Sequence, residues 1–110
     1  MEIAVDKRQN CAILKIKGDV DLYSSPQARS QIIALVNKKH INLLVDFTDV
    51  TYMDSSGVAT LVEALQLTNK NKGKLRLYKL KQAIRDVFEL SRLDKVFDIY
   101  DDEQSALHGI

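Results

Sequence analysis

The chain has 110 residues and a formal net charge of +1, with 16 lysine and arginine residues against 15 aspartate and glutamate residues. A chain of this length folds as one domain, which we expect to span residues 1–110. Proteins that bind the nucleic acid backbone carry a clear basic excess, so this balance argues against a nucleic acid partner. The longest apolar run, residues 32–36, is too short for a membrane span or a signal peptide. The sequence therefore predicts a cytoplasmic protein without membrane insertion.

The N-terminal half predicts a hairpin, a helix and a buried strand. Residues 2–6 and 11–17 are β-leaning segments that flank a polar turn, which is typical of a hairpin. Ser25 is a preferred helix cap, and the proline after it suits the first helical position. Apolar residues then recur at helical spacing up to the lysines at positions 38 and 39, where we expect the helix to end. The apolar run over residues 41–47 suits a central strand that is covered on both faces.

The C-terminal half predicts alternating helices and strands. Apolar positions at helical spacing indicate a helix over residues 56–70, and alternating leucines indicate a strand over residues 74–79. A third helix follows, with an apolar stripe formed by Ala83, Val87 and Leu90. A last strand over residues 96–100 and a short helix over residues 101–108 complete the chain. This order predicts an α/β fold, a single domain with a mixed sheet that contains the N-terminal hairpin and has helices packed on it.

Residues that carry enzymatic chemistry are scarce. The one cysteine, Cys11, has no second thiol for a disulfide, a metal site or a redox pair, and we interpret it as a small apolar residue in a strand. His40 and His108 lie in polar segments and are interpreted as solvated side chains. The sequence has no glycine-rich phosphate loop, no GxSxG elbow and no metal-ligand spacing. We therefore expect a protein that is not an enzyme and has no cofactor or metal.

Residues 47–57 connect the expected central strand to the second helix, and they contain the run Asp54-Ser55-Ser56-Gly57. In a parallel α/β unit, the end of a strand and the start of the next helix form a usual site for an anion, because free backbone N–H groups point outward there. The two serine hydroxyls lie at that position. The alternative is that Asp54, Ser55 or Ser56 only caps the helix, since all three are preferred cap types.

The same segment resembles a known family signature. Residues 44–58 are similar to the signature of the STAS domain of bacterial anti-sigma factor antagonists. The upstream run Gly18-Asp19-Val20-Asp21 resembles that family's Gly-Glu-Leu-Asp loop, and residues 88–93 resemble its Phe-x-x-x-Gly-Leu stretch. The sequence departs from the pattern at Val58-Ala59, where Leu-Gly is more usual, and in residues 91–93, which lack the glycine.

The resemblance implies a mixed sheet with helices and a regulatory function. It implies that Ser55 accepts phosphate from a partner that is both an anti-sigma factor and a serine kinase, and that a phosphoserine phosphatase reverses the reaction. It also places an acidic residue, here Asp21, near the phosphoacceptor. The residues expected to bind the partner are Asp21, Asp54, Ser55, Ser56 and Gly57. The unmodified form is expected to bind the anti-sigma factor and free a sigma factor.

Two details and two alternatives accompany this interpretation. We expect Ser55 rather than Ser56 to be the acceptor, with Ser56 capping a helix that begins at Gly57. Asp21 has an alternative interpretation as a residue that only turns the chain before the first helix. For the whole chain, the first alternative is a non-switching STAS scaffold in a stress-signalling or membrane transport complex. The second is a serine hydrolase that uses Ser55.

Overall fold

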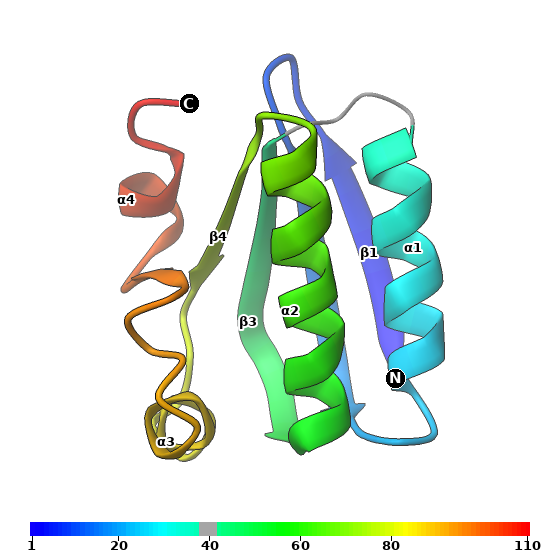
Figure 1. The fold of residues 1–110 in the computed structure, drawn as a ribbon, viewed down its shortest axis with the longest axis vertical. Helices are drawn as coiled ribbons and strands as arrows, with labels where there is room; N and C mark the ends of the chain where they lie inside the picture. Colours follow the sequence, from blue (N-terminus) through cyan, green and yellow to red (C-terminus); the bar gives the residue numbers. More distant parts are fainter. Residues whose placement is uncertain (38–41) are drawn as a thin grey trace.

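The computed structural model describes residues 1–37 and 42–110. Their strands form one five-stranded sheet in the order β1-β2-β3-β4-β5. The first pair of strands is antiparallel and the other pairs are parallel, which confirms the mixed α/β sheet with an N-terminal hairpin (Figure 1). The elements are β1 (Glu2–Lys7), β2 (Ala12–Val20), α1 (Ser25–Asn37), β3 (Asn42–Met53), α2 (Ser55–Lys70), β4 (Lys74–Tyr78), α3 (Gln82–Leu90), β5 (Asp98–Tyr100) and α4 (Glu103–Leu107).

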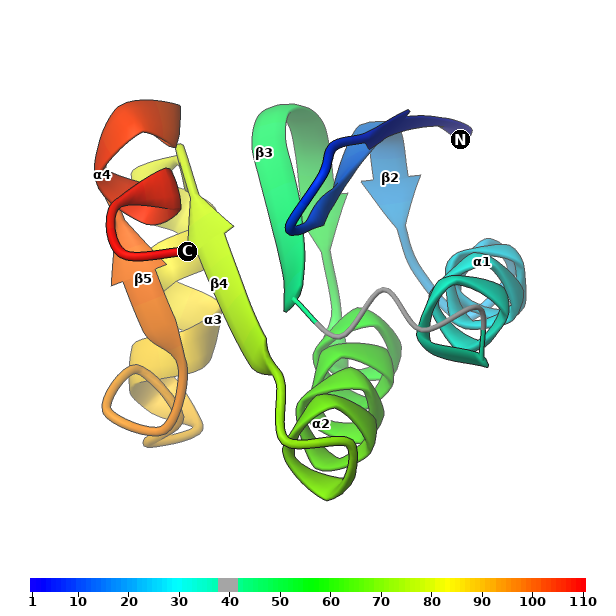
Figure 2. The same ribbon diagram turned by 90° about the horizontal axis from the view of Figure 1, so that it is seen from above.

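The two faces of the sheet are covered differently. Helices α1, α2 and α3 contribute to the main apolar core on one face, together with inward-pointing residues of β2, β3 and β4. The short helix α4 covers part of the opposite face through a smaller apolar cluster. Figure 2 shows α1 and α2 together on one side of the sheet, with α4 beside β4 and β5. This double coverage explains why Leu43, Leu44 and Val45 are all fully buried although consecutive side chains of β3 point to opposite faces.

Strand β3 is longer than its apolar run predicts. It continues to Met53 instead of ending at Phe47, so most of the expected connection is strand. Pairing with β2 explains the difference, because register shifts after Lys15 and Gly18 let both strands continue side by side to Val20 and Met53. The start of the strand that we expected at Ile41 lies outside the described residues, as do the lysines at positions 38 and 39 and His40.

Strand β4 is buried on both faces, although an alternation of leucines with other residues is typical of a strand with one solvated face. Leu75 and Leu77 face the main core as expected, but Arg76 and Tyr78 are also buried, with exposed fractions of 7% and 1%. Helix α4 packs over that second face. A long-range covering element of this kind leaves no mark in the periodicity of the strand itself.

Helix α3 forms where expected, but its buried stripe is different. Val87 is half-buried against the main core as expected, but Ile84 and Phe88 are the fully buried residues, while Ala83 is exposed and Leu90 is 85% exposed. Phe88 packs edge-on against Phe97, with ring centroids 5.3 Å apart, and this contact orients the helix. The buried face of α3 is therefore defined by Ile84 and Phe88, which are four residues apart, and Phe88 contacts Phe97 in the segment after the helix.

Other element ends shift by one or two residues. Helix α1 includes Ser25, and the Ser24 carbonyl accepts hydrogen bonds from the first turn, so Ser25 is not the cap. Strand β5 begins at Asp98 instead of residue 96. Cys11 is a free, buried thiol immediately before β2, and the His108 side chain is exposed after α4. These shifts are the ordinary consequence of end turns being decided by local hydrogen bonds.

Helix α3 ends in a Schellman motif without the glycine that this motif favours. The N–H of Leu93 donates to the Phe88 carbonyl at 2.8 Å, and the N–H of Arg92 donates to the Glu89 carbonyl at 3.0 Å. Arg92 holds the left-handed conformation that these bonds require, with φ of 58°. A side chain in this conformation costs free energy that glycine does not.

The substitution Arg92→Gly is expected to stabilise the domain by about 0.5–1 kcal/mol. Relief of left-handed strain of about 1–2 kcal/mol exceeds the entropic cost of glycine, about 0.5–1 kcal/mol. Urea unfolding monitored by circular dichroism measures the change. The control Arg92→Ala removes the guanidinium but keeps the strain, so an equal gain in Arg92→Ala would contradict this explanation.

Candidate functional site

The candidate site forms where β2 and β3 end together. Val20 pairs with Met53 at the last position of both strands. One residue later, the Asp54 N–H donates to the Val20 carbonyl at 3.2 Å. Because the two strands are parallel, this bond places the Asp54-Ser55-Ser56-Gly57 run beside the loop that begins at Asp21.

Asp54 caps helix α2. Its backbone is extended, with φ of −108° and ψ of −171°, and its carboxylate Oδ1 accepts hydrogen bonds from the N–H groups of Ser56 at 2.9 Å and Gly57 at 3.4 Å. The helix therefore begins at Ser55, and the expectation that Ser56 caps a helix beginning at Gly57 is wrong. The carboxylate of Asp54 occupies the free N–H groups that the sequence suggested for an external anion.

The two serines differ in accessibility. Ser55, the first residue of α2, is exposed, whereas Ser56 is half-buried in the same turn. The Ser56 carbonyl also accepts a hydrogen bond from the Thr60 hydroxyl at 3.1 Å inside the helix. Of the two hydroxyls, that of Ser55 is the one that an external macromolecule reaches more directly.

Gly57 lies where the first turn of α2 approaches the end of β2. A Cβ atom at this position would lie 2.8 Å from Met53 Cγ, 2.9 Å from Val20 Cγ1 and 3.0 Å from the Val20 carbonyl oxygen. The last contact is with backbone, which cannot move aside by a simple side-chain rotation. Glycine is therefore needed here for close packing of the helix on the strand.

Asp21 organises the loop between β2 and α1. Its Oδ1 accepts hydrogen bonds from the N–H groups of Tyr23 and Ser24, both at 3.0 Å, and the Ser24 hydroxyl accepts one from the Asp21 N–H at 2.9 Å. These bonds, with that from the Ser24 N–H as the largest cause, hold the pKa of Asp21 below its ordinary value. Within residues 1–37 and 42–110, no hydrogen bond joins Asp21 to Ser55. Asp21 therefore forms the turn before α1, and its expected role in partner binding stays a prediction.

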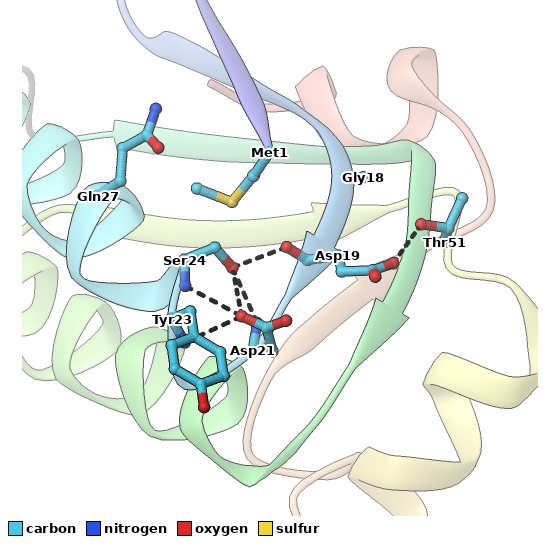
Figure 3. A pocket seen from close by; sticks show the side chains of 8 residues that line it. All are labelled: Met1, Gly18, Asp19, Asp21, Tyr23, Ser24, Gln27 and Thr51. Carbon is cyan, nitrogen blue, oxygen red and sulfur yellow. Dashed lines mark hydrogen bonds between the residues drawn. The ribbon is translucent and has the colours of Figure 1, made fainter.

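A hydrogen-bonded cluster and an open pocket lie beside this loop (Figure 3). The Thr51 hydroxyl donates to the Asp19 carboxylate at 2.6 Å, and the Ser24 hydroxyl donates to the Asp19 carbonyl at 2.7 Å. The pocket has a volume of about 610 Å³, and Ser55 is not among its lining residues. These residues are Met1, Gly18, Asp19, Asp21, Tyr23, Ser24, Gln27 and Thr51.

Three exposed apolar or aromatic side chains in the β2–α1 loop and near the end of β3 were not predicted from the sequence. Leu22 is 66% exposed and Tyr23 is 90% exposed in the loop after Asp21, and Tyr52 is 52% exposed near the end of β3. Two consecutive large apolar residues in a polar loop were the available signal. Exposed side chains of this size next to one another are typical of a protein interaction surface.

The described residues show neither a metal-binding cluster nor a membrane-spanning helix. They contain no group of three or more His, Cys, Asp and Glu side chains arranged to hold a metal ion. In the same part of the chain, no helix combines the length and apolar character needed to cross a membrane. The site presents the exposed Ser55 directly after Asp54, whose carboxylate caps α2.

The substitution Gly57→Ala is expected to destabilise the domain by about 1–2 kcal/mol. Overpacking against Val20 costs about 1–3 kcal/mol, partly offset by the better helix propensity of alanine. Thermal unfolding measures the loss. Because the clash involves Val20, Val20→Ala should cost less stability in the Gly57→Ala background than in the original chain. Additive effects of the two substitutions would contradict the packing explanation.

The substitution Asp21→Asn is expected to lower stability at pH 7 by an amount that shrinks in acid. A carboxylate whose pKa is lowered on folding stabilises the protein above its unfolded-state pKa, which is about 3.9, and this contribution is lost as pH falls through the lower folded-state pKa. Urea unfolding at several pH values between 7 and 2.5 measures the difference. A matched control is Asp49→Asn, which removes an exposed carboxylate outside this turn. A difference independent of pH would contradict the role assigned to the Asp21 carboxylate.

Known proteins resemble this chain in sequence and in fold. The chain is 31% identical over 101 residues to the anti-sigma-B factor antagonist of Bacillus subtilis (strain 168), covering 90% of this chain and 92% of that protein. The crystal structure of an anti-sigma factor antagonist from Mycobacterium paratuberculosis superposes with a TM-score of 0.88 at 24% identity, covering 96% and 90% of the two chains. The Bacillus cell fate determinant SpoIIAA in its phosphorylated form superposes with a TM-score of 0.74 at 19% identity, covering 94% and 96%. The STAS domain model matches residues 2–106, and the chain therefore belongs to the STAS domain family.

Proposed function

We propose that this chain is an anti-sigma factor antagonist that is switched by phosphorylation of Ser55. In its unmodified form it binds an anti-sigma factor and so frees a sigma factor. When Ser55 carries phosphate, the anti-sigma factor is released. The observation that carries the proposal is the exposed Ser55 hydroxyl at the first residue of α2, beside exposed apolar side chains of the neighbouring loop.

The position of Ser55 supports a role as phosphoacceptor. A kinase must bring its catalytic base and the nucleotide phosphate to the hydroxyl, so the acceptor has to be accessible. Ser55 meets this requirement better than Ser56, which is half-buried. The chain needs no general base of its own, because the kinase supplies it.

The charge around Ser55 supports a switch of affinity. Phosphate adds about −1.5 to −2 charges at neutral pH. It would lie next to Asp54, whose carboxylate already accepts the N–H groups of the first turn of α2. A second anion here is therefore not neutralised by those groups, and an unpaired charge in an interface costs about 2–5 kcal/mol. That cost corresponds to roughly a 30- to 4,000-fold loss of affinity.

The surface next to Ser55 supports a protein partner. Leu22 and Tyr23 project from the loop that the Val20–Asp54 hydrogen bond holds beside the serine run. Buried apolar anchors near the centre of an interface supply most of its binding free energy, and a charge placed beside them weakens it strongly. The names of the relatives point to the same class of partner, since the Bacillus subtilis protein is an anti-sigma-B factor antagonist.

The proposal implies two kinds of protein partner. One is an anti-sigma factor that is also a serine kinase, and the other is a phosphoserine phosphatase that restores the binding form; the sigma factor is freed from the anti-sigma factor and does not bind this chain. One solved neighbour, SpoIIAA from Bacillus, has itself been obtained in a phosphorylated form. Asp21 and Gly57 contribute indirectly, by shaping the two loops that present Ser55 and the apolar side chains.

Phosphorylation is expected on Ser55 and is expected to abolish most of the binding. The chain, Ser55→Ala and Ser56→Ala are each incubated with ATP and the serine kinase anti-sigma factors encoded in the source genome, and phosphopeptides are mapped by mass spectrometry. Phosphate should appear in the chain and in Ser56→Ala but not in Ser55→Ala. Calorimetry with the same anti-sigma factor should then give at least about a 30-fold weaker Kd for the phosphorylated chain.

Two variants separate the switch from the scaffold alternative. Ser55→Ala removes only a hydroxyl and should bind as the unmodified chain does, while Ser55→Asp adds one charge and should bind more weakly. Phosphate on Ser56 in the Ser55→Ala variant would show that the acceptor is misassigned. Equal affinities for the unmodified chain, its phosphorylated form and Ser55→Asp would favour a non-switching scaffold.

A further inference from the structure

Helix α4 covers an apolar area on the face of the sheet opposite the other helices (Figures 1 and 2). It has only the five residues Glu103–Leu107 and begins at Asp102, whose side chain caps the Ser105 N–H at 2.8 Å. A helix this short is not stable alone in water, so its structure depends on docking. Its Ala106 packs in an apolar cluster with Cys11, Ile13, Leu44 and Tyr78.

Arg76 holds the C-terminal end of α4. Its Nη1 donates to the carbonyl oxygens of Ala106 at 2.9 Å and His108 at 2.5 Å, which have no partner inside so short a helix. The guanidinium also lies 5.4 Å from the ring centroid of Tyr100. At the N-terminal end, the Glu103 carboxylate accepts hydrogen bonds from Arg8 at 3.2 Å and from the Tyr78 hydroxyl at 3.4 Å.

The docked position of Arg76 is costly. The side chain is 7% exposed, its Nε has no hydrogen-bond partner, and no carboxylate among the described residues lies within ion-pair distance of it. The two hydrogen bonds to the end of α4 stabilise the docked state, but the cost of burying a cation that is only partly hydrogen-bonded offsets part of this gain, so docking is only weakly favoured. Undocking of α4 would return the Arg76 guanidinium to water.

We propose that α4 is a strap that opens and closes while the rest of the domain stays folded, with Arg76 as its latch. Closing joins Arg76 to the end of α4 and covers the apolar cluster. Opening rehydrates Arg76 and exposes the side chain of Cys11, which is 3% exposed in the closed state. The main core, which α1, α2 and α3 form with the other face of the sheet, contains none of the buried residues of this cluster.

Cys11 provides a direct readout, because it is the one cysteine of the chain and lies under the strap. Its reaction with 5,5′-dithiobis(2-nitrobenzoic acid) is followed in the full chain at urea concentrations below the unfolding transition. The dependence of an opening equilibrium on urea scales with the surface that opening exposes. If α4 opens alone, the free energy of opening obtained from Cys11 labelling should change much less with urea concentration than the free energy of global unfolding measured by circular dichroism. Equal dependences would overturn the proposal, since Cys11 would then react only after the whole domain unfolds.

The latch is tested by Arg76→Ala, with Lys74→Ala as a matched control that removes an exposed cation from the same strand. Loss of the two hydrogen bonds should speed Cys11 labelling at least about tenfold, which corresponds to about 1.4 kcal/mol of opening free energy. Lys74→Ala should leave the rate unchanged. An unchanged rate in folded Arg76→Ala would overturn the role of Arg76. If Arg76→Ala does not fold, the urea dependence of Cys11 labelling in the original chain still tests whether α4 opens separately from the rest of the domain.

Discussion

The close approach of helix α2 to the end of strand β2 is the packing constraint on which the site depends. A Cβ at Gly57 would lie 2.9 Å from Val20 Cγ1 and 3.0 Å from the Val20 carbonyl oxygen. The same carbonyl accepts the Asp54 N–H, so one backbone group of β2 fixes both the cap and the third residue of α2. With the helix start held in this way, Ser55 has a defined position beside the loop after β2. A larger residue at position 57 would displace the helix start and the serine with it.

Three residues of the Asp54-Ser55-Ser56-Gly57 run have different structural settings. Asp54 caps the helix and Gly57 permits its packing, while Ser55 faces solvent. A modification of Ser55 can therefore change the charge of the surface without disturbing the core. The Asp54 carboxylate also accepts the N–H groups of Ser56 and Gly57, so under the proposed function these groups would not neutralise a phosphate on Ser55. This arrangement suits a residue whose charge acts on a partner more than on the fold.

The two faces of the sheet differ in how firmly they are covered. One face carries the main core under α1, α2 and α3, and the other is covered in part by the five residues of α4. The first face contains helices long enough to bury continuous apolar stripes. The second depends on a few apolar side chains and on Arg76, a buried cation with an unpaired Nε. Stability is therefore expected to be distributed unevenly, with α4 at the low end.

The sequence by itself determined the α/β order, the mixed sheet and the serine run at a helix start, because apolar periodicity and turn residues are local signals. It could not show which residue caps α2, since Asp54, Ser55 and Ser56 are all suitable and only the Val20–Asp54 bond decides where the helix begins. It also could not show that Arg76 and Tyr78 are buried or that Leu22 and Tyr23 are exposed. Burial depends on which distant segment covers a side chain, and that is a property of the tertiary structure alone.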